Sequence, residues 1–193
     1  MRKMFFFVLA AAALLLMVPA QNAQAQSSET PKVEVGAHYT LLRLRDFDIT
    51  DNGVGGRVTF NLADSLGLEG ELNFFPQKRT NSIVPLLFQD STRTQGLFGV
   101  KTGLRSEKAG IFAKIRPGFF RFGESTSIGG VPGPSFTQFA LDFGGVFELY
   151  PSRSVAIRFD VGDTIIRFGS NFTGGDAFNS NNLQLSTGVA FRF

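Results

Sequence analysis

The residues VGGRVTFNLADSLGLEGELNF at 54–74 indicate the type of secondary structure that this chain forms. Within 54–62, and again within 66–74, every second residue is apolar or glycine, and the positions between them include arginine and glutamate. A period of two is the signature of a β-strand with two unlike faces. Because only residues 63–65 separate the two segments, we expect a β-hairpin with one uncharged face and one charged face.

The same alternation occurs in eight segments after Lys32. The uncharged face consists of alternate residues of 33–41, 54–62, 66–74, 98–104, 111–119, 139–149, 155–161 and 183–193. No apolar run after Val18 is long enough for a membrane-spanning helix, which needs about 20 residues. Strands therefore carry the hydrophobicity of the chain.

The connections between these segments alternate in length. The short ones are 63–65, 105–109 and 151–153, and the long ones are 43–52, 76–93, 123–136 and 169–181. Outer-membrane barrels have short periplasmic turns and long external loops. Since only helices and closed barrels satisfy every backbone group in hydrocarbon, we expect an all-β, eight-stranded, antiparallel up-and-down transmembrane β-barrel.

A soluble barrel of the lipocalin kind would place the apolar face inside and the charged face outside. Three features favour the membrane barrel: the phenylalanine-rich uncharged face, the rim of short turns, and the ending formed by Val189, Phe191 and Phe193. That ending resembles the terminal-strand signal by which outer-membrane barrels are recognised for assembly.

Residues 32–193 resemble the small outer-membrane β-barrel proteins, the group that includes the membrane domain of OmpA and OmpX. The segments 53–62 and 68–73 are typical of that group. The resemblance implies an outer-membrane location, contact with lipid and lipopolysaccharide, and docking of the C-terminal strand on the barrel assembly machinery. The chain departs from the group in having no Trp and only Tyr39 and Tyr150, so an aromatic girdle would consist mainly of Phe.

The N-terminus has the layout of a secretory signal peptide. Arg2 and Lys3 precede an apolar run over 5–18, and Ala23-Gln24-Ala25 supplies small residues for cleavage. We expect residues 1–25 to be removed, 26–31 to form a short lead and 32–193 to form the barrel. Without Arg2 and Lys3 the formal charge falls from +3 to +1, so the basic composition is no argument for nucleic acid.

The charged face contributes six acids and six bases to the barrel interior. They are Glu34, Arg57, Glu69, Glu71, Lys101, Lys114, Arg116, Asp142, Glu148, Arg158, Asp160 and Arg192. Eight strands leave an interior just wide enough for side chains, and an unpaired charge there would be costly. We therefore expect a network of ion pairs that fills the interior. A narrow ion-conducting path through these side chains is the alternative.

His38, the only histidine, lies on the inward parity. Small barrel enzymes that act on lipid A can use a Ser/His/acid arrangement on the outer face, but His38 points the wrong way and no serine follows two positions later. With one His, no Cys and carboxylates committed to basic partners, a metal site is not favoured either. We expect no enzymatic activity and no cofactor.

Two places interrupt the pattern. Pro117 lies within a strand and has no N–H to donate, which predicts a bulge or a lost ladder bond. The parity shifts between Asp163 and Phe168, which predicts a bulge in the seventh strand.

These observations predict a non-enzymatic outer-membrane protein that contributes to envelope integrity or to surface interaction. The long external loops are exposed and free of packing constraints, so a surface ligand would bind there. A narrow porin-like channel for ions or small solutes is the alternative function.

Overall fold

The computed structural model describes residues 30–76, 92–124, 135–169 and 176–193. The predicted signal peptide, and the central parts of three predicted long connections, lie outside the described residues. Within them, no helix is both long enough and apolar enough to cross a membrane.

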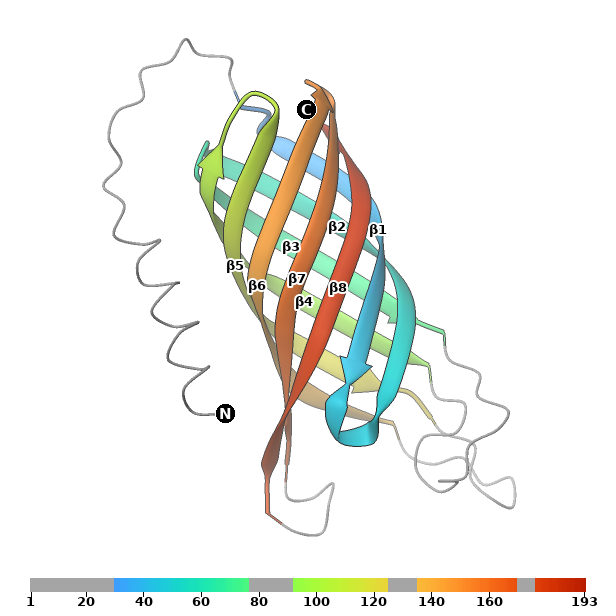
Figure 1. Cartoon of the computed structure of the whole chain (residues 1–193). Coiled ribbons are helices and arrows are strands. Elements are labelled where there is room, and N and C mark those ends of the chain that lie inside the picture. Colours follow the sequence, from blue (N-terminus) through green and yellow to red (C-terminus); the bar gives the residue numbers. More distant parts are fainter. Residues whose placement is uncertain (1–29, 77–91, 125–134, 170–175) are drawn as a thin grey trace. The chain divides into compact units, whose positions relative to one another are not determined.

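Eight antiparallel strands form one closed barrel, in which β1 pairs with β2 and the last strand returns to pair with β1 (Figure 1). The strands are β1 (Val33–Leu44), β2 (Ile49–Ala63), β3 (Leu66–Phe75), β4 (Arg93–Arg105), β5 (Ala109–Phe122), β6 (Phe136–Ser152), β7 (Val155–Phe168) and β8 (Phe178–Arg192). Each strand pairs with its neighbours in sequence, so the topology is up-and-down as predicted.

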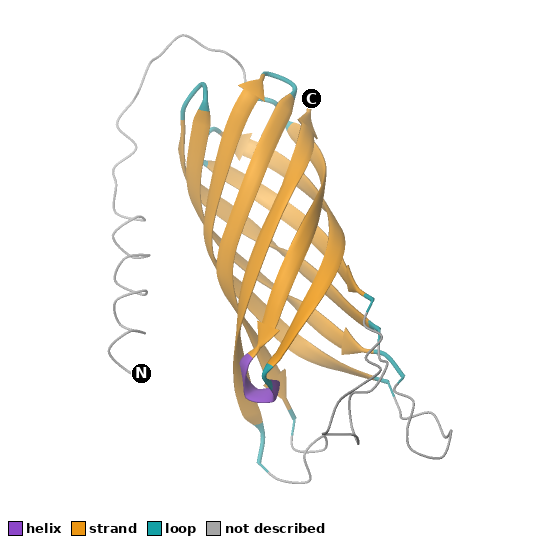
Figure 2. Ribbon diagram, turned by 45° about the vertical axis from the view of Figure 1, so that its right-hand side comes forward, coloured by secondary structure: helices purple, strands orange, loops and turns teal. Residues whose placement is uncertain are grey.

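The two ends of the barrel differ. The C-terminus lies at the end where short connections join β2 to β3, β4 to β5 and β6 to β7 (Figure 1). We call this the inner end, and the opposite end the outer end. At the outer end the predicted long connection over 43–52 is wrong, because β1 runs to Leu44 and β2 already begins at Ile49. A single 3-10 turn, η1 (Arg45–Phe47), and Asp48 with a positive φ of 47° join them (Figure 2).

The two faces of the barrel wall have opposite chemistry. The outward side chains of Leu72 and Phe98 are each 63% exposed, whereas the inward side chains of Glu69 and Arg116 are fully buried. A lipocalin-like barrel would show the reverse arrangement. The outward apolar face is therefore the surface that meets lipid.

The predicted interruption at Pro117 is present as a local loss of pairing. Pro117 faces Leu141 of β6, but the pairing of β5 with β4 is interrupted between Leu97↔Gly118 and Val100↔Ile115. The register is the same on both sides, so the strand contains no bulge there. The missing proline N–H explains why one ladder is interrupted while the other continues.

The predicted bulge between Asp163 and Phe168 is absent. The pairing of β7 with β8 runs in one register from Val155↔Phe191 to Phe168↔Phe178. The inward and outward positions of β7 alternate without interruption. Along the strand the outward residues change from apolar to charged, and the inward residues change from charged to apolar. Asp163 lies on the outward face, while Ile166 and Phe168 are buried inside the barrel.

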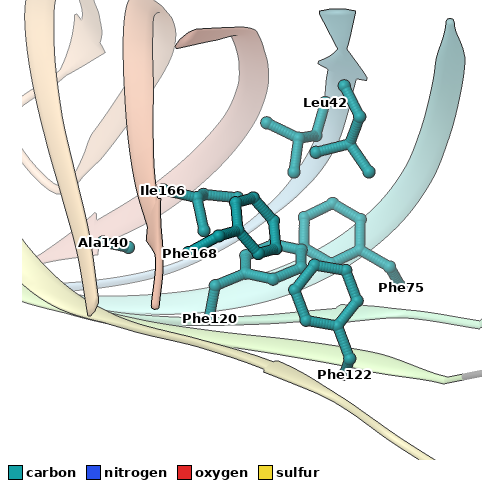
Figure 3. Close-up of a cluster of buried hydrophobic side chains, with 8 residues drawn as sticks. Leu42, Phe75, Phe120, Phe122, Ala140, Ile166 and Phe168 are labelled. Carbon is teal, nitrogen blue, oxygen red and sulfur yellow. The ribbon is translucent and has the colours of Figure 1, made fainter. Parts of the chain in front are cut away.

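The inward apolar residues at the outer end form one cluster, which we call the outer apolar layer (Figure 3). Its members are Leu42, Leu44, Phe75, Phe120, Phe122, Ala140, Ile166 and Phe168. The Phe120 and Phe122 ring centroids lie 4.9 Å apart, and the Phe122 and Phe168 centroids 5.9 Å. The cluster joins side chains from β1, β3, β5, β6 and β7 across the interior.

Candidate functional site: the barrel interior

All twelve charged residues that the alternation assigned to the interior are buried within the barrel. Arg116 on β5 lies at the centre of the network. Its Nη1 lies 2.6 Å from Glu71 Oε2 and its Nη2 lies 2.7 Å from Asp142 Oδ2, while Nε donates to the same Asp142 oxygen at 2.8 Å. One guanidinium therefore connects the walls formed by β3 and β6.

Arg158 and Arg57 extend the network across the barrel. Arg158 on β7 donates to both carboxylate oxygens of Glu69, with Nη2 2.9 Å from Oε2, and to Asp160 at 2.9 Å. Arg57 on β2 binds Glu71 at 2.6 Å and lies 3.2 Å from Asp160. Glu71 and Asp160 thus each have two arginine partners, which offsets the cost of burying their charges.

At the inner end the network continues with lysine and arginine. Lys101 Nζ lies 2.5 Å from Glu148 Oε1 and 3.6 Å from Glu34 Oε2. Glu34 also accepts from Arg192 at 3.3 Å, which joins β1 to β8. Arg105 lies 3.5 Å from Glu34 and 3.7 Å from Glu148. Sequence reasoning missed Arg105 because it placed this residue in a turn.

A layer of neutral polar side chains lies between the ionic network and the outer apolar layer. Asn73 donates to Gln95 at 2.8 Å, Gln95 donates to Gln184 at 3.0 Å, and Thr164 donates to the same Gln184 oxygen at 2.7 Å. On the other wall, Ser186 donates to Thr40 at 3.0 Å. We call this the amide layer.

One further ion pair lies at the level of the outer apolar layer. Arg93 on β4 donates to Asp51 on β2, and its guanidinium lies 5.6 Å from the centroid of the Phe122 ring. Sequence reasoning assigned both charged residues to long connections. The signal that could have found them is the parity of β2 and β4, since both residues continue the inward alternation of their strands.

His38 is inward, as its parity indicated. Its Nε2 lies 2.6 Å from Asn73 Oδ1 and 3.6 Å from Glu71 Oε1. These contacts make His38 a polar filler between the ionic network and the amide layer. Among the described residues, no group of three or more His, Asp or Glu side chains is arranged to hold a metal ion.

One small cavity lies within the ionic network. A cavity of about 20 Å³ lies beside His38, Arg57 and Arg158, next to the small residues Gly36 and Gly188. A volume of that size holds about one water molecule. Ionic network, amide layer and outer apolar layer therefore follow one another along the described barrel from its inner to its outer end.

The polarity of the wall reverses toward the outer end. On β7 the outward residues change from Phe159 and Val161 to Arg167, while the inward residues change from Asp160 to Phe168. On β1, β5 and β8 the outward face likewise ends in polar residues. Charge outside and phenyl rings inside is the arrangement of a water-exposed barrel, so this part of the wall lies beyond the hydrocarbon.

A closed barrel with an apolar outward band and a charged interior is the architecture of an outer-membrane protein. A family model described as the outer membrane protein beta-barrel domain matches residues 10–193. The chain belongs to this family. Members of the family lie in the bacterial outer membrane, so the outward band of this barrel meets outer-membrane lipid.

Solved structures of outer-membrane barrels share this fold. Neisserial surface protein A is 14% identical, with a TM-score of 0.59, and Ail, the attachment invasion locus protein of Yersinia pestis, is 14% identical with a TM-score of 0.53. The N-terminal β-barrel domain of OprF from Pseudomonas aeruginosa is 13% identical with a TM-score of 0.50. Each match covers 83% of this chain and 96% of the other. Comparison with curated protein sequences finds no match.

Proposed function

We propose that this chain is a non-enzymatic, non-conducting outer-membrane barrel that contributes to envelope integrity and presents its long connections at the cell surface. The observation that supports the proposal is the stacking of three layers of contacting side chains along the interior. An ion crossing the barrel would have to separate the pairs around Arg116 and then pass between the rings of Phe120, Phe122 and Phe168.

Both steps are energetically unfavourable. Removing one partner of a buried ion pair leaves an uncompensated charge, which costs about 3–5 kcal/mol. Porins that conduct freely have about 16–18 strands around an aqueous channel, whereas eight strands enclose only side chains. The ionic interior therefore serves as a rigid core.

The surface role is supported by the outer end of the wall. The strand pairs β3/β4, β5/β6 and β7/β8 end there, and residues 77–91, 125–134 and 170–175 connect them. Because the wall at this end is polar outside and apolar inside, the strand ends that these connections join lie beyond the lipid. Ail is named for attachment and Neisserial surface protein A for the surface, and a surface role for this chain follows that analogy.

We also propose that the C-terminal strand docks on the barrel assembly machinery through Val189, Phe191 and Phe193. All three side chains point outward near the inner end and are 48%, 60% and 73% exposed. They form an apolar row that a partner strand could contact on entry into the membrane.

One pair of measurements tests the functional proposal. In planar lipid bilayers the purified chain should give no openings above the bare membrane, with a porin as the positive control. A strain that lacks the chain should become more permeable to detergent, and the intact chain should restore it better than a variant whose 77–91 connection is replaced by a short turn. Reproducible voltage-independent openings would show a channel instead, and equal restoration by both forms would place the role in the barrel alone.

A further inference from the structure

The cavity of about 20 Å³ within the ionic network lies against the wall formed by β1, β7 and β8. The inward residues of that wall are small, since Gly36 pairs with Ala190 and Ala190 pairs in turn with Ala156. Because these residues have at most one side-chain carbon, they leave space beside the charged side chains of the other strands. The cavity has room for about one water molecule, and a chloride ion is only slightly larger.

His38 lines this cavity, and its side chain is only 2% exposed. Asn73 Nδ2 donates to Glu71 Oε1 at 2.7 Å and to Gln95 Oε1 at 2.8 Å. The Asn73 Oδ1 atom, 2.6 Å from His38 Nε2, is therefore an acceptor, and Nε2 has the hydrogen. In the neutral ring this leaves a lone pair on Nδ1. No described residue hydrogen-bonds Nδ1, so this atom can accept a proton.

The charges around the cavity balance one another only while His38 is neutral. Glu34 and Glu148 line the cavity together with Arg57 and Arg158, so two negative and two positive groups surround the neutral ring. A proton on Nδ1 would give this lining a net charge of +1. One monovalent anion in the cavity would restore neutrality and accept a hydrogen bond from Nδ1–H.

The rest of the network cannot supply that negative charge. It consists of the six acids and six bases of the alternation, and Arg105 is a seventh base, so with His38 neutral its described residues have a net charge of +1. The lining residues from β8 are glycine, valine and alanine, which have no charge. A further uncompensated positive charge would be costly in this interior. The charged groups that line the cavity or lie near His38 are Glu34 on β1, Arg57 on β2, Glu71 on β3, Glu148 on β6, and Arg158 and Asp160 on β7.

We propose that the cavity binds one small monovalent anion, such as chloride, together with a proton on His38 Nδ1. While the ring is neutral, the matching occupant is a water molecule that donates to the Nδ1 lone pair. Once Nδ1 is protonated, the anion accepts its hydrogen and offsets its charge. Proton and anion therefore bind cooperatively, and each raises the affinity for the other by the same factor. This binding function is separate from the proposed role in envelope integrity and does not depend on it.

Other ligands match the cavity less well. A metal cation would add positive charge to a network that already has an excess of it, and it would face Arg57 and Arg158. A polyatomic anion such as gluconate is far larger than the space for one water molecule. Size and charge together therefore select a monatomic anion.

The test is the titration of His38 in the untagged mature barrel, labelled with ¹⁵N-histidine and folded in phosphatidylcholine nanodiscs. Because His38 is the only histidine, its ring nitrogens give the only labelled signals, and their chemical shifts report which nitrogen is protonated. The titration covers about pH 5–8, the range in which histidine changes its charge. Mixtures of potassium chloride and potassium gluconate keep the ionic strength constant, so general screening is the same throughout. The chain is folded in each mixture, which lets the buried cavity equilibrate.

We expect the midpoint of the titration to rise with chloride concentration. Because one anion binds with one proton, the rise should approach about one pH unit for each tenfold increase in chloride once the protonated site is saturated. Gluconate alone should leave the midpoint at its lowest value.

Substitutions that fill the cavity should remove this chloride dependence. Ala190→Leu adds three carbons to the lining of the cavity, whereas Ala113→Leu adds the same atoms to the outward face of β5 and should titrate as the unaltered chain does. Ala156→Val is a smaller filling substitution on β7 that tests the site if Ala190→Leu does not fold. A gel shift on boiling verifies that each variant is folded.

Three results would overturn the inference. Equal midpoints in chloride and gluconate, or a ring that stays neutral in both salts, would leave water as the only occupant. Equal chloride dependence in Ala190→Leu and Ala113→Leu would place the anion outside the cavity. Protonation at Nε2 instead of Nδ1 would contradict the assigned hydrogen position and remove the donor to the anion.

Discussion

Arg116 shows what a single side chain does in this interior. It is fully buried and contacts Glu71 and Asp142 at 2.6–2.8 Å, with Glu69 at 3.5 Å. Its planar fork meets acceptors in several directions at once, which a lysine ammonium on a flexible stem reproduces poorly. The residue therefore holds β3 and β6 at a fixed separation across the barrel.

Replacing Arg116 by alanine should lower the free energy of unfolding by about 3–5 kcal/mol, because three carboxylates lose a partner without gaining water. Arg116→Met tests whether charge or volume matters, and it should be nearly as destabilising since the carboxylates remain. The measurement is equilibrium unfolding by urea in lipid vesicles. Arg153→Ala, at an exposed turn position, should change stability by less than about 0.5 kcal/mol. Equal stabilities for Arg116→Ala and Arg153→Ala would show that the network contributes nothing.

The alternation of the sequence was sufficient to assign twelve charged residues to the interior, but it could not assign their partners. Arg158 and Glu69 are 89 residues apart in the chain and meet only because the barrel closes. Asp51 and Arg93 were not predicted to be inward. The outward residues beside them are polar, so strands defined by an apolar face were predicted to end before these two positions. The parity of a strand is thus more informative than the hydrophobicity of one of its faces.

At the scale of the element, β7 and β5 show which irregularities a sequence reveals. The loss of pairing at Pro117 could be predicted because it follows from one missing N–H. The bulge expected in β7 was wrong because the change from apolar to polar residues between Asp163 and Phe168 was taken for a shift of parity. Asp163 and Arg167 lie on the outward face instead, in the half of β7 that is nearest the outer end.

The last strand carries the prediction at this scale. Phe193 is exposed, and its backbone pairs with Val33 through N–H···O distances of 2.8 and 3.2 Å, so its side chain contributes little to the closed barrel. We expect Phe193→Ser to lower the amount of barrel assembled in cells several-fold while leaving the urea unfolding of refolded protein nearly unchanged. Membrane fractionation and the boiling-dependent gel shift measure the first quantity. Normal assembly of Phe193→Ser would remove Phe193 from the proposed assembly signal.

For the whole molecule, the reversal of wall polarity determines how deep the barrel lies in the membrane. The outward apolar band ends where Arg43, Arg121 and Arg167 begin, and the outer apolar layer lies inside the barrel at the same end. Moving the barrel inward would bring these arginines into hydrocarbon, and moving it outward would expose the band to water. Both displacements cost free energy, so the depth is defined.

A pair of substitutions tests that depth. Ile115, half exposed on the outward face at the middle of β5, should lie near the bilayer centre, whereas Leu104 lies one residue from the end of β4. Ile115→Arg should destabilise the folded barrel by about 2–4 kcal/mol and Leu104→Arg by only about 0–1 kcal/mol, as the depth of the introduced charge requires. Urea unfolding in vesicles of fixed thickness gives both values. If Leu104→Arg lowered the free energy of unfolding more than Ile115→Arg does, the bilayer centre would lie nearer Leu104 than Ile115.

The pairing of β1 with β8 also constrains how the chain is made. Glu34 and Arg192 are in contact across that seam although 158 residues separate them. The barrel therefore cannot close until β8 is available to pair with β1. Contacts of such long sequence separation form slowly, and unpaired edges and exposed phenylalanines invite aggregation meanwhile. Until β8 pairs with β1, both edge strands stay unpaired and the ionic core stays incomplete.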